Sequence, residues 1–121
     1  MNQKNKILLF VYGTLLSGEP NHTLLNDARF MGKAMTQPCY ELLDFGFFPT
    51  LVPEGHVSVC GEVYAVDEKT LQAIDQLEGH PHWYRRTVIT LADGREVFTY
   101  IQPKEHAKKH PRIQSGDWRI R

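Results

Sequence analysis

The chain has 121 residues, of which 41% are hydrophobic and 23% are charged. This composition is typical of a water-soluble globular protein, and the length suits one hydrophobic core, so we expect a single domain over residues 1–121. Lys plus Arg and Asp plus Glu both number 14. Because no net positive charge attracts a phosphate backbone, we expect no nucleic-acid partner and favour a small-molecule ligand.

The N-terminal residues and the cysteines bear on where the protein works. A run of five strongly apolar residues, 7–11, precedes Tyr12 and Gly13, and it is too short for a signal sequence or a membrane span. Cys39 and Cys60 are isolated in the sequence, so we expect both to be reduced thiols. These features predict a cytoplasmic protein with no membrane association.

The first predicted element is a strand over residues 7–12. This continuous apolar run is closed by Gly13, a pattern typical of a central strand that is buried on both faces. Turn-forming residues follow, and Asn21 is a candidate N-cap for a short helix that extends to Ala28.

The middle of the chain predicts strands on either side of an aromatic loop. Residues 30–43 predict an irregular strand, and residues 44–55 predict a loop rich in aromatic side chains. Because burying each such ring is favourable by about 1.5–3 kcal/mol, we expect this loop to fold over part of the molecule. Apolar residues then alternate with others over residues 57–65, which predicts a half-buried strand.

The clearest helix covers residues 68–78. Asp67 is a good N-cap, and Gly79 supplies a C-terminal stop. Apolar side chains recur on one face of this segment, at Leu71, Ile74 and Leu77.

A hairpin follows the helix. Residues 84–92 and 95–101 are rich in β-branched and aromatic residues, and Asp93-Gly94 between them predicts a type I′ turn. The tail from residue 102 has no strong periodicity. Five or six strands with one or two short helices predict an α+β fold whose small mixed or antiparallel sheet curls toward a barrel.

Gly13 marks the first candidate site. A glycine directly after a buried strand allows a sharp turn, which leaves the following backbone N–H groups free to converge on an anion such as a carboxylate or an oxyanion. A tight turn with no ligand explains the same pattern. Both interpretations stay open at this point.

Glu78 is the second candidate. At the C-terminal end of a helix the macrodipole opposes a carboxylate by roughly 0.3–1 kcal/mol, which raises its pKa. Burial under Trp83 or Tyr84 would raise the pKa further, as a general base working near neutral pH requires. A solvated acid at a frayed helix end is the alternative.

Tyrosines and histidines give weaker signals. Tyr12, Tyr64, Tyr84 and Tyr100 lie in or beside predicted strands, where a tyrosine either packs or turns its hydroxyl into a pocket. Arg85 and Arg86 alternate faces, so at most one of them can face the same pocket as Tyr84.

The histidines prompt a metal hypothesis that we do not favour. His80 with His82 and His106 with His110 have ligand-like spacing, but neither pair has a third ligand at a fixed distance in the sequence, so we expect no metal. The sequence also has no nucleophile elbow, P-loop or dinucleotide fingerprint.

Several motifs in order resemble the γ-glutamylcyclotransferase-like family, and the nearest branch is that of the γ-glutamylamine cyclotransferases, or AIG2-like proteins. The resemblance runs from about residue 8 to the end of the chain. The matching segments are Phe-Val-Tyr-Gly-Thr-Leu at 10–15, Gly-Glu-Pro-Asn-His at 18–22, Gly-Glu-Val-Tyr-Ala-Val-Asp at 61–67, Ile-Asp-Gln-Leu-Glu-Gly at 74–79, Tyr-Arg-Arg-Thr at 84–87 and Ser-Gly-Asp-Trp at 115–118.

This resemblance implies a barrel-like mixed α/β fold and the conversion of a γ-glutamyl amide into 5-oxoproline and a free amine, without cofactor or metal. It implies that the loop of Tyr12, Gly13, Thr14 and Leu15 holds the glutamyl α-carboxylate or carbonyl oxygen. It further implies that Glu78 is the acid/base residue and that Tyr84 and Tyr100 line the pocket.

Two departures from the family leave the leaving amine open. Many relatives carry Ser where this chain has Thr14, and the chain is short beside the vertebrate enzymes. A non-catalytic module that binds a small carboxylate on the same fold is the alternative function. The sequence does not predict the oligomeric state.

Overall fold

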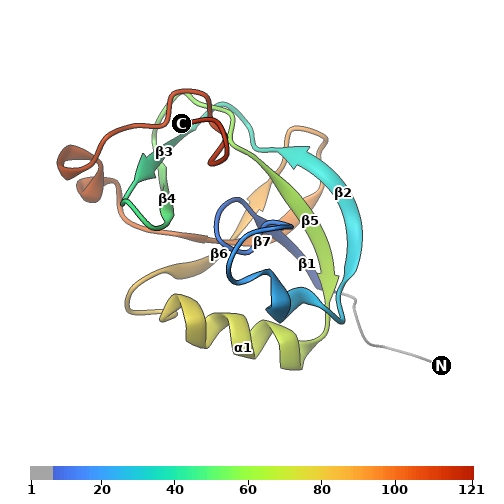
Figure 1. Cartoon of the computed structure of the whole chain (residues 1–121). Helices are drawn as coiled ribbons and strands as arrows, with labels where there is room; N and C mark the ends of the chain where they lie inside the picture. Colours follow the sequence, from blue (N-terminus) through green and yellow to red (C-terminus); the bar gives the residue numbers. More distant parts are fainter. Residues whose placement is uncertain (1–6) are drawn as a thin grey trace.

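The computed structural model describes residues 7–121, except for the side chains of residues 106–108. Five strands form one mixed sheet in the order β2-β5-β1-β7-β6, and two further strands pair antiparallel beside it (Figure 1). The strands are β1 (Ile7–Val11), β2 (Arg29–Met35), β3 (Tyr40–Asp44), β4 (Pro49–Pro53), β5 (Cys60–Val66), β6 (Arg85–Thr90) and β7 (Glu96–Ile101). The helix α1 (Glu68–Glu78) crosses below the sheet in Figure 1, so the predicted α+β class is confirmed.

Strand β1 lies at the centre of the large sheet, as predicted. It pairs antiparallel with β5 and parallel with β7, and Leu9 and Phe10 are completely buried. Beyond the ends of the edge strands β2 and β6, an isolated bridge joins Thr36 to Leu91, and the Ala92 N–H donates to the Met35 carbonyl at 2.9 Å. The sheet therefore curls toward a barrel, although this bridge is not a ladder that closes it.

Helix α1 has the predicted bounds and ends. The Asp67 carboxylate accepts a hydrogen bond from the Thr70 N–H at 2.8 Å, and Gly79 has a left-handed φ of 67° that ends the helix. Leu71 and Ile74 are buried, which anchors the helix and brings its last residue, Glu78, to the region where β1 ends. No helix in the described residues is long and apolar enough to cross a membrane.

The predicted helix over residues 21–28 is wrong. Only His22–Leu25 is helical, as a short 3-10 turn, and Asn21 makes no side-chain cap. The Asn21 amide instead donates to the Thr14 hydroxyl at 3.0 Å. A tertiary contact therefore replaces the local cap that would have started a longer helix.

The predictions for residues 30–55 need two corrections. The segment 30–43 contains two strands in different sheets, β2 and β3, separated by Pro38, which has no N–H to continue a ladder. The predicted loop over 44–55 contains β4, because pairing with β3 and complete burial of residues 50–52 fix an extended backbone there. The aromatic loop is thereby reduced to residues 45–48.

The strand expected over 57–65 begins at Cys60, and it is buried on both faces rather than one. Strand β5 lies between β2 and β1, so Glu62 and Tyr64, on the face expected to be exposed, are also buried. Cys60 and Cys39 are both free thiols.

The hairpin β6–β7 is confirmed, but its turn differs from the predicted type I′ turn. The Gly94 N–H donates to the Leu91 carbonyl at 2.9 Å. The central residues of the turn are therefore Ala92 and Asp93, rather than Asp93 and Gly94.

The C-terminal tail packs on the core despite its lack of periodicity. After a 3-10 helix (Lys104–Lys109), Ile113 donates its N–H to the Leu42 carbonyl at 2.7 Å, and Gly116 accepts from the Cys60 N–H at 2.8 Å. The Ile113 and Trp118 side chains are buried. Long-range contacts of this kind leave no periodic pattern in the sequence.

Candidate active site

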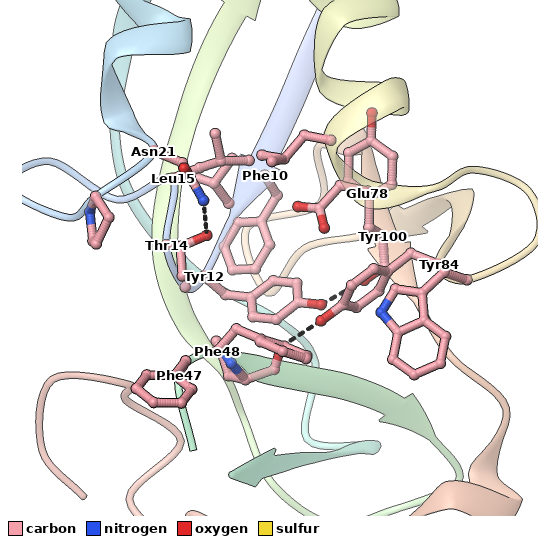
Figure 2. Close-up of a pocket in the computed structure, with 16 residues that line it drawn as sticks. Phe10, Tyr12, Thr14, Leu15, Asn21, Phe47, Phe48, Glu78, Tyr84 and Tyr100 are labelled. Carbon is pink, nitrogen blue, oxygen red and sulfur yellow. Dashed lines mark hydrogen bonds between the residues drawn. The ribbon is translucent and has the colours of Figure 1, made fainter. Parts of the chain in front are cut away.

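A cavity of about 410 Å³ lies where the end of β1, the β3–β4 loop, the end of α1 and the start of β6 meet (Figure 2). All seven residues that the resemblance assigns to the site line it, and they come from segments far apart in the chain. The lining consists of Phe10, Val11, Tyr12, Gly13, Thr14, Leu15, Pro20, Asn21, Phe47, Phe48, Pro49, Leu77, Glu78, Trp83, Tyr84 and Tyr100.

The turn after β1 presents backbone donors at the cavity. The Leu16 N–H donates to the Gly13 carbonyl at 3.0 Å and closes the turn. The N–H groups of residues 13–15 make no hydrogen bond to another part of the chain that the structure describes. A Cβ at Gly13 would lie 2.5 Å from Pro49 Cγ, so only glycine permits this close approach. Such a turn is suited to bind an anion.

Thr14 adds a hydroxyl to this turn, and Asn21 orients it. The Asn21 side-chain amide donates to Thr14 Oγ1 at 3.0 Å, and the Asn21 N–H donates to the Thr14 carbonyl at 2.9 Å. Because Thr14 Oγ1 accepts the amide hydrogen, its own hydrogen can point to a ligand. Sequence reasoning missed Asn21 as a site residue, since it interpreted the side chain as a helix cap.

Glu78 supplies the one carboxylate of the cavity lining. Figure 2 shows its carboxylate turned toward the space beside Phe10 and Tyr12. The side chain is half-buried, and no other described residue donates a hydrogen bond to it. Desolvation by burial raises the pKa of Glu78 from 4.5 to about 7. The sequence predicted that the helix end, and burial under Trp83 or Tyr84, would raise this pKa, and burial is the cause found here.

The tyrosine hydroxyls near the cavity bond to the protein itself. Tyr12 donates to the Tyr100 carbonyl at 2.6 Å and accepts from the Leu51 N–H at 3.3 Å. Tyr84 donates to the Pro49 carbonyl at 2.8 Å. Burial raises the pKa of both tyrosines. Their rings therefore serve as neutral walls of the cavity.

Tyr100 connects the cavity to an ion pair behind it. Its hydroxyl donates to Asp75 Oδ1 at 2.6 Å, while Arg86 donates to Asp75 Oδ2 at 2.6 Å. The Arg86 guanidinium also lies 5.0 Å from the centre of the Phe98 ring. Neither Arg86 nor Arg85 lines the cavity, so neither faces the pocket that Tyr84 lines.

The histidines do not converge on a metal site in the described part of the chain. No group of three His, Cys, Asp or Glu side chains lies close enough there to hold a metal ion. His80 Nδ1 accepts from the Arg86 N–H at 2.9 Å, and the His110 ring stacks on Phe45. The side chain of His106 lies outside the described residues.

The sequence profile of the family described as gamma-glutamyl cyclotransferase, AIG2-like, matches residues 9–120. The chain belongs to this family. A Vibrio cholerae protein named "Putative gamma-glutamylcyclotransferase" is 50% identical over 111 residues, which are 92% of this chain and 94% of that protein. Human gamma-glutamylaminecyclotransferase is 43% identical over 91 residues, or 68% of this chain and 60% of the human protein.

Solved structures agree with this assignment. The crystal structure of an AIG2-like protein from Mus musculus superposes with a TM-score of 0.81 at 31% identity, covering 92% of this chain and 88% of the mouse chain. Both the family resemblance and the fold expected from the sequence are thereby confirmed. The names of these relatives support cyclotransferase activity, and they leave the substrate open.

Within this gamma-glutamyl cyclotransferase-like cavity, no lining residue is a cysteine, serine, histidine or lysine. The described lining therefore has no Ser–His or Cys–His pair, and its aliphatic hydroxyl, that of Thr14, accepts a hydrogen bond from Asn21. A reaction in which the substrate carries its own nucleophile fits such a site.

Proposed function

We propose that this chain is a γ-glutamyl amide cyclotransferase that uses Glu78 as its general acid/base residue. The observation that carries the proposal is a half-buried carboxylate that shares one cavity with a turn whose backbone N–H groups have no partner among the described residues. Burial raises the pKa of this carboxylate to about 7. The products are 5-oxoproline and a free amine. The reaction needs no cofactor, because the attacking amine and the γ-carbonyl belong to the same molecule.

The first task of the site is to hold the substrate in a folded conformation. We expect the N–H groups of residues 13–15 and the Thr14 hydroxyl to bind the α-carboxylate or the γ-carbonyl oxygen. The rings of Phe10, Tyr12 and Tyr84 limit the remaining space. Because the α-amine and the γ-carbonyl already belong to one molecule, the site accelerates the reaction by holding them at reacting distance and orientation, not by joining two molecules.

The second task is proton transfer. Glu78 takes a proton from the α-ammonium group, and the freed amine attacks the γ-carbonyl carbon to form the five-membered ring. The N–H groups stabilise the oxygen as it becomes negative. Glu78 then returns this proton to the departing nitrogen as the bond between it and the γ-carbon breaks. The second proton that the ring nitrogen loses passes to the released amine, which leaves as an ammonium ion. A pKa near 7 suits both roles at neutral pH.

The experiment that tests this proposal measures 5-oxoproline released from a panel of γ-glutamyl amides by the purified protein and by Glu78→Gln. Gln has the size of Glu but cannot accept the proton, so we expect kcat to fall by about 10²–10⁴. Equal rates in the two proteins would contradict the mechanism. Stabilisation by γ-glutamyl amides without turnover in the unmodified protein would instead favour the non-catalytic binding module.

A further inference from the structure

The backbone donors of the candidate site depend on the orientation of three consecutive peptide groups, which join residues 13 to 16. All three are trans. In a trans peptide group the carbonyl and the following N–H point in opposite directions. The orientation of the Thr14 and Leu15 N–H groups is therefore fixed by the donors that bind the Gly13 and Thr14 carbonyls.

These first two carbonyls accept hydrogen bonds from backbone N–H groups. The Leu16 N–H donates to the Gly13 carbonyl at 3.0 Å, and the Asn21 N–H donates to the Thr14 carbonyl at 2.9 Å. Thr14 and Leu15 line the cavity, and their own N–H groups have no partner among the described residues. Both N–H groups are therefore available to a bound anion.

A side chain binds the third carbonyl, that of Leu15. His22 Nδ1 lies 2.9 Å from the Leu15 carbonyl oxygen. Because a carbonyl oxygen only accepts, Nδ1 carries the hydrogen in this bond. The Leu15 carbonyl belongs to the same peptide group as the Leu16 N–H, which closes the turn on Gly13. His22 thus fixes the peptide group on which the closure of the turn depends.

The His22 ring is itself fixed in place. The His22 N–H donates to the Glu19 carbonyl at 3.1 Å, and the half-buried imidazole has its ring centre 5.6 Å from that of Tyr64. The Tyr64 hydroxyl in turn donates to Glu62 Oε1 at 2.9 Å. A donor that is fixed before a ligand arrives need not be ordered on binding, which favours affinity and correct orientation.

We infer that His22 is a positioning residue of the site, which orients the backbone donors of Thr14 and Leu15 through its hydrogen bond to the Leu15 carbonyl. His22 does not line the cavity, so it acts through the turn and not on the substrate. The inference rests on the proposed cyclotransferase function, because it concerns the turn that we expect to bind the glutamyl group. It is independent of proton transfer by Glu78.

Two variants separate the hydrogen bond of His22 from its packing. His22→Phe keeps a flat ring beside Tyr64 but lacks the donor, whereas His22→Asn lacks the ring but has an amide nitrogen close to the place of Nδ1. For 5-oxoproline release from γ-glutamyl amides, we expect kcat/KM to fall about 5-fold to 10-fold in His22→Phe and less than about 2-fold in His22→Asn. A role in packing alone would give the reverse order.

A matched control and the pH profile complete the kinetic test. His56→Phe makes the same change at an exposed histidine outside the cavity lining, and it should leave kcat/KM unchanged. In both His22 variants kcat/KM should begin to fall at the same pH, near 7, because Glu78 is untouched. If His22→Phe does not fold, His22→Ala takes its place, since it differs from His22→Asn by the amide.

NMR spectra test the geometry without turnover. A long-range ¹H–¹⁵N spectrum of the imidazoles should show the hydrogen of His22 on Nδ1. Addition of 5-oxoproline, the proposed product, should shift the N–H signals of Thr14 and Leu15 in the unmodified protein and in His22→Asn. The same shifts should be smaller in His22→Phe.

The outcomes separate this inference from the function on which it rests. Full activity in His22→Phe would overturn the inference and leave the cyclotransferase function in place. Equal losses in His22→Phe and His22→Asn, or a hydrogen of His22 found on Nε2 alone, would do the same. Failure of every γ-glutamyl amide to release 5-oxoproline from the unmodified protein would overturn both.

Discussion

Glu62 and Glu78 are two glutamates with opposite surroundings. Glu62, in the middle of β5, is only 3% exposed, and its carboxylate accepts hydrogen bonds from the Ser17 N–H at 2.9 Å, the Ser17 hydroxyl at 3.0 Å and the Tyr64 hydroxyl at 2.9 Å. Arg119 Nη1 lies 3.5 Å from Glu62 Oε2. Glu78 receives no hydrogen bond from another described residue and faces a cavity.

The contrast teaches that burial alone does not make a carboxylate a base. For Glu62, burial acts to raise the pKa, but the hydrogen bonds from Ser17 and Tyr64 together with Arg119 outweigh it, and the pKa is lowered. For Glu78, burial acts without such donors, and the pKa rises to about 7. A buried carboxylate becomes available for proton transfer when its surroundings leave it unpaired.

Glu62 instead supports the loop that forms the other side of the cavity. It fixes Ser17, which follows the turn of residues 13–15 by two positions. Arg119 donates to the Ser17 carbonyl, and Trp118 Nε1 donates to Glu19 Oε1 at 3.1 Å, so the C-terminal tail holds the same loop. Glu62 thus stabilises this loop, whereas the Glu78 carboxylate accepts no hydrogen bond from another described residue.

The largest expected effect is on the pH dependence of catalysis. With a Glu78 pKa of about 7, the ionised fraction and with it kcat/KM should fall about 50-fold between pH 7 and pH 5, approaching a tenfold fall per pH unit at the lower end. Initial rates of 5-oxoproline release across pH 5–8 measure this. In Glu62→Gln, kcat/KM should begin to fall at the same pH, near 7. A limb near pH 4.5 in the unmodified enzyme would contradict the role given to Glu78.

The second prediction concerns the stability that Glu62 supplies. Glu62→Gln replaces an acceptor with an amide that cannot satisfy all three donors, so the free energy of unfolding at pH 7 should fall by about 1–3 kcal/mol. Because the folded pKa of Glu62 is lowered, its contribution is present above the ordinary pKa and is lost as the pH falls through the folded value. Urea unfolding at pH 7 and at pH 4 should show a smaller difference at the lower pH.

Glu78→Gln should change the free energy of unfolding in the opposite direction to Glu62→Gln. Below pH 4.5 the carboxyl is protonated in both the folded and unfolded states, whereas above pH 7 the folded state holds a desolvated charge. The variant lacks this charge, so it should be more stable than the unmodified protein at pH 8, by on the order of 1–2 kcal/mol, and equally stable near pH 4. Urea unfolding at both pH values measures the difference. A loss of stability at pH 8 would mean that Glu78 has a stabilising partner.

The smallest effect is expected at Asn21. Removing its amide with Asn21→Ala frees Thr14 Oγ1 to accept from other donors and relaxes the turn, so kcat/KM should fall by about 5-fold to 10-fold. The limb of the pH profile near pH 7 should stay in place, because Glu78 is untouched. A shift of that limb would show that Asn21 acts on the base instead of on the turn.

The parts of the fold that the sequence predicted are those with local causes. The apolar run of β1 and the Asp67 cap of α1 need only neighbouring residues, and both were correct. Strand β4 was missed because its extended backbone depends on pairing with β3. Asn21 was misinterpreted because its partner, Thr14, lies outside its own helical turn.

The same difference between local and long-range causes explains which parts of the candidate site were predicted. The motifs named Glu78 and the turn at Gly13, and the structure brings both to one cavity. The aromatic part of the cavity lining was not predictable in detail, since it depends on the packing of Phe48 and Trp83 against the ring of Tyr84. The difference between Glu62 and Glu78 was equally hidden, because the donors to Glu62 come from a distant loop as well as its own strand.

The most direct test of the contrast between the two glutamates is a carbon NMR titration of the glutamate side-chain carboxyls, with Glu62→Gln and Glu78→Gln used to assign the two signals. It requires no knowledge of the substrate. The predicted result is a Glu78 signal that titrates near pH 7 and a Glu62 signal that titrates below pH 4.5. A Glu78 signal that titrates near pH 4.5 would contradict the assignment of Glu78 as a base poised for neutral pH.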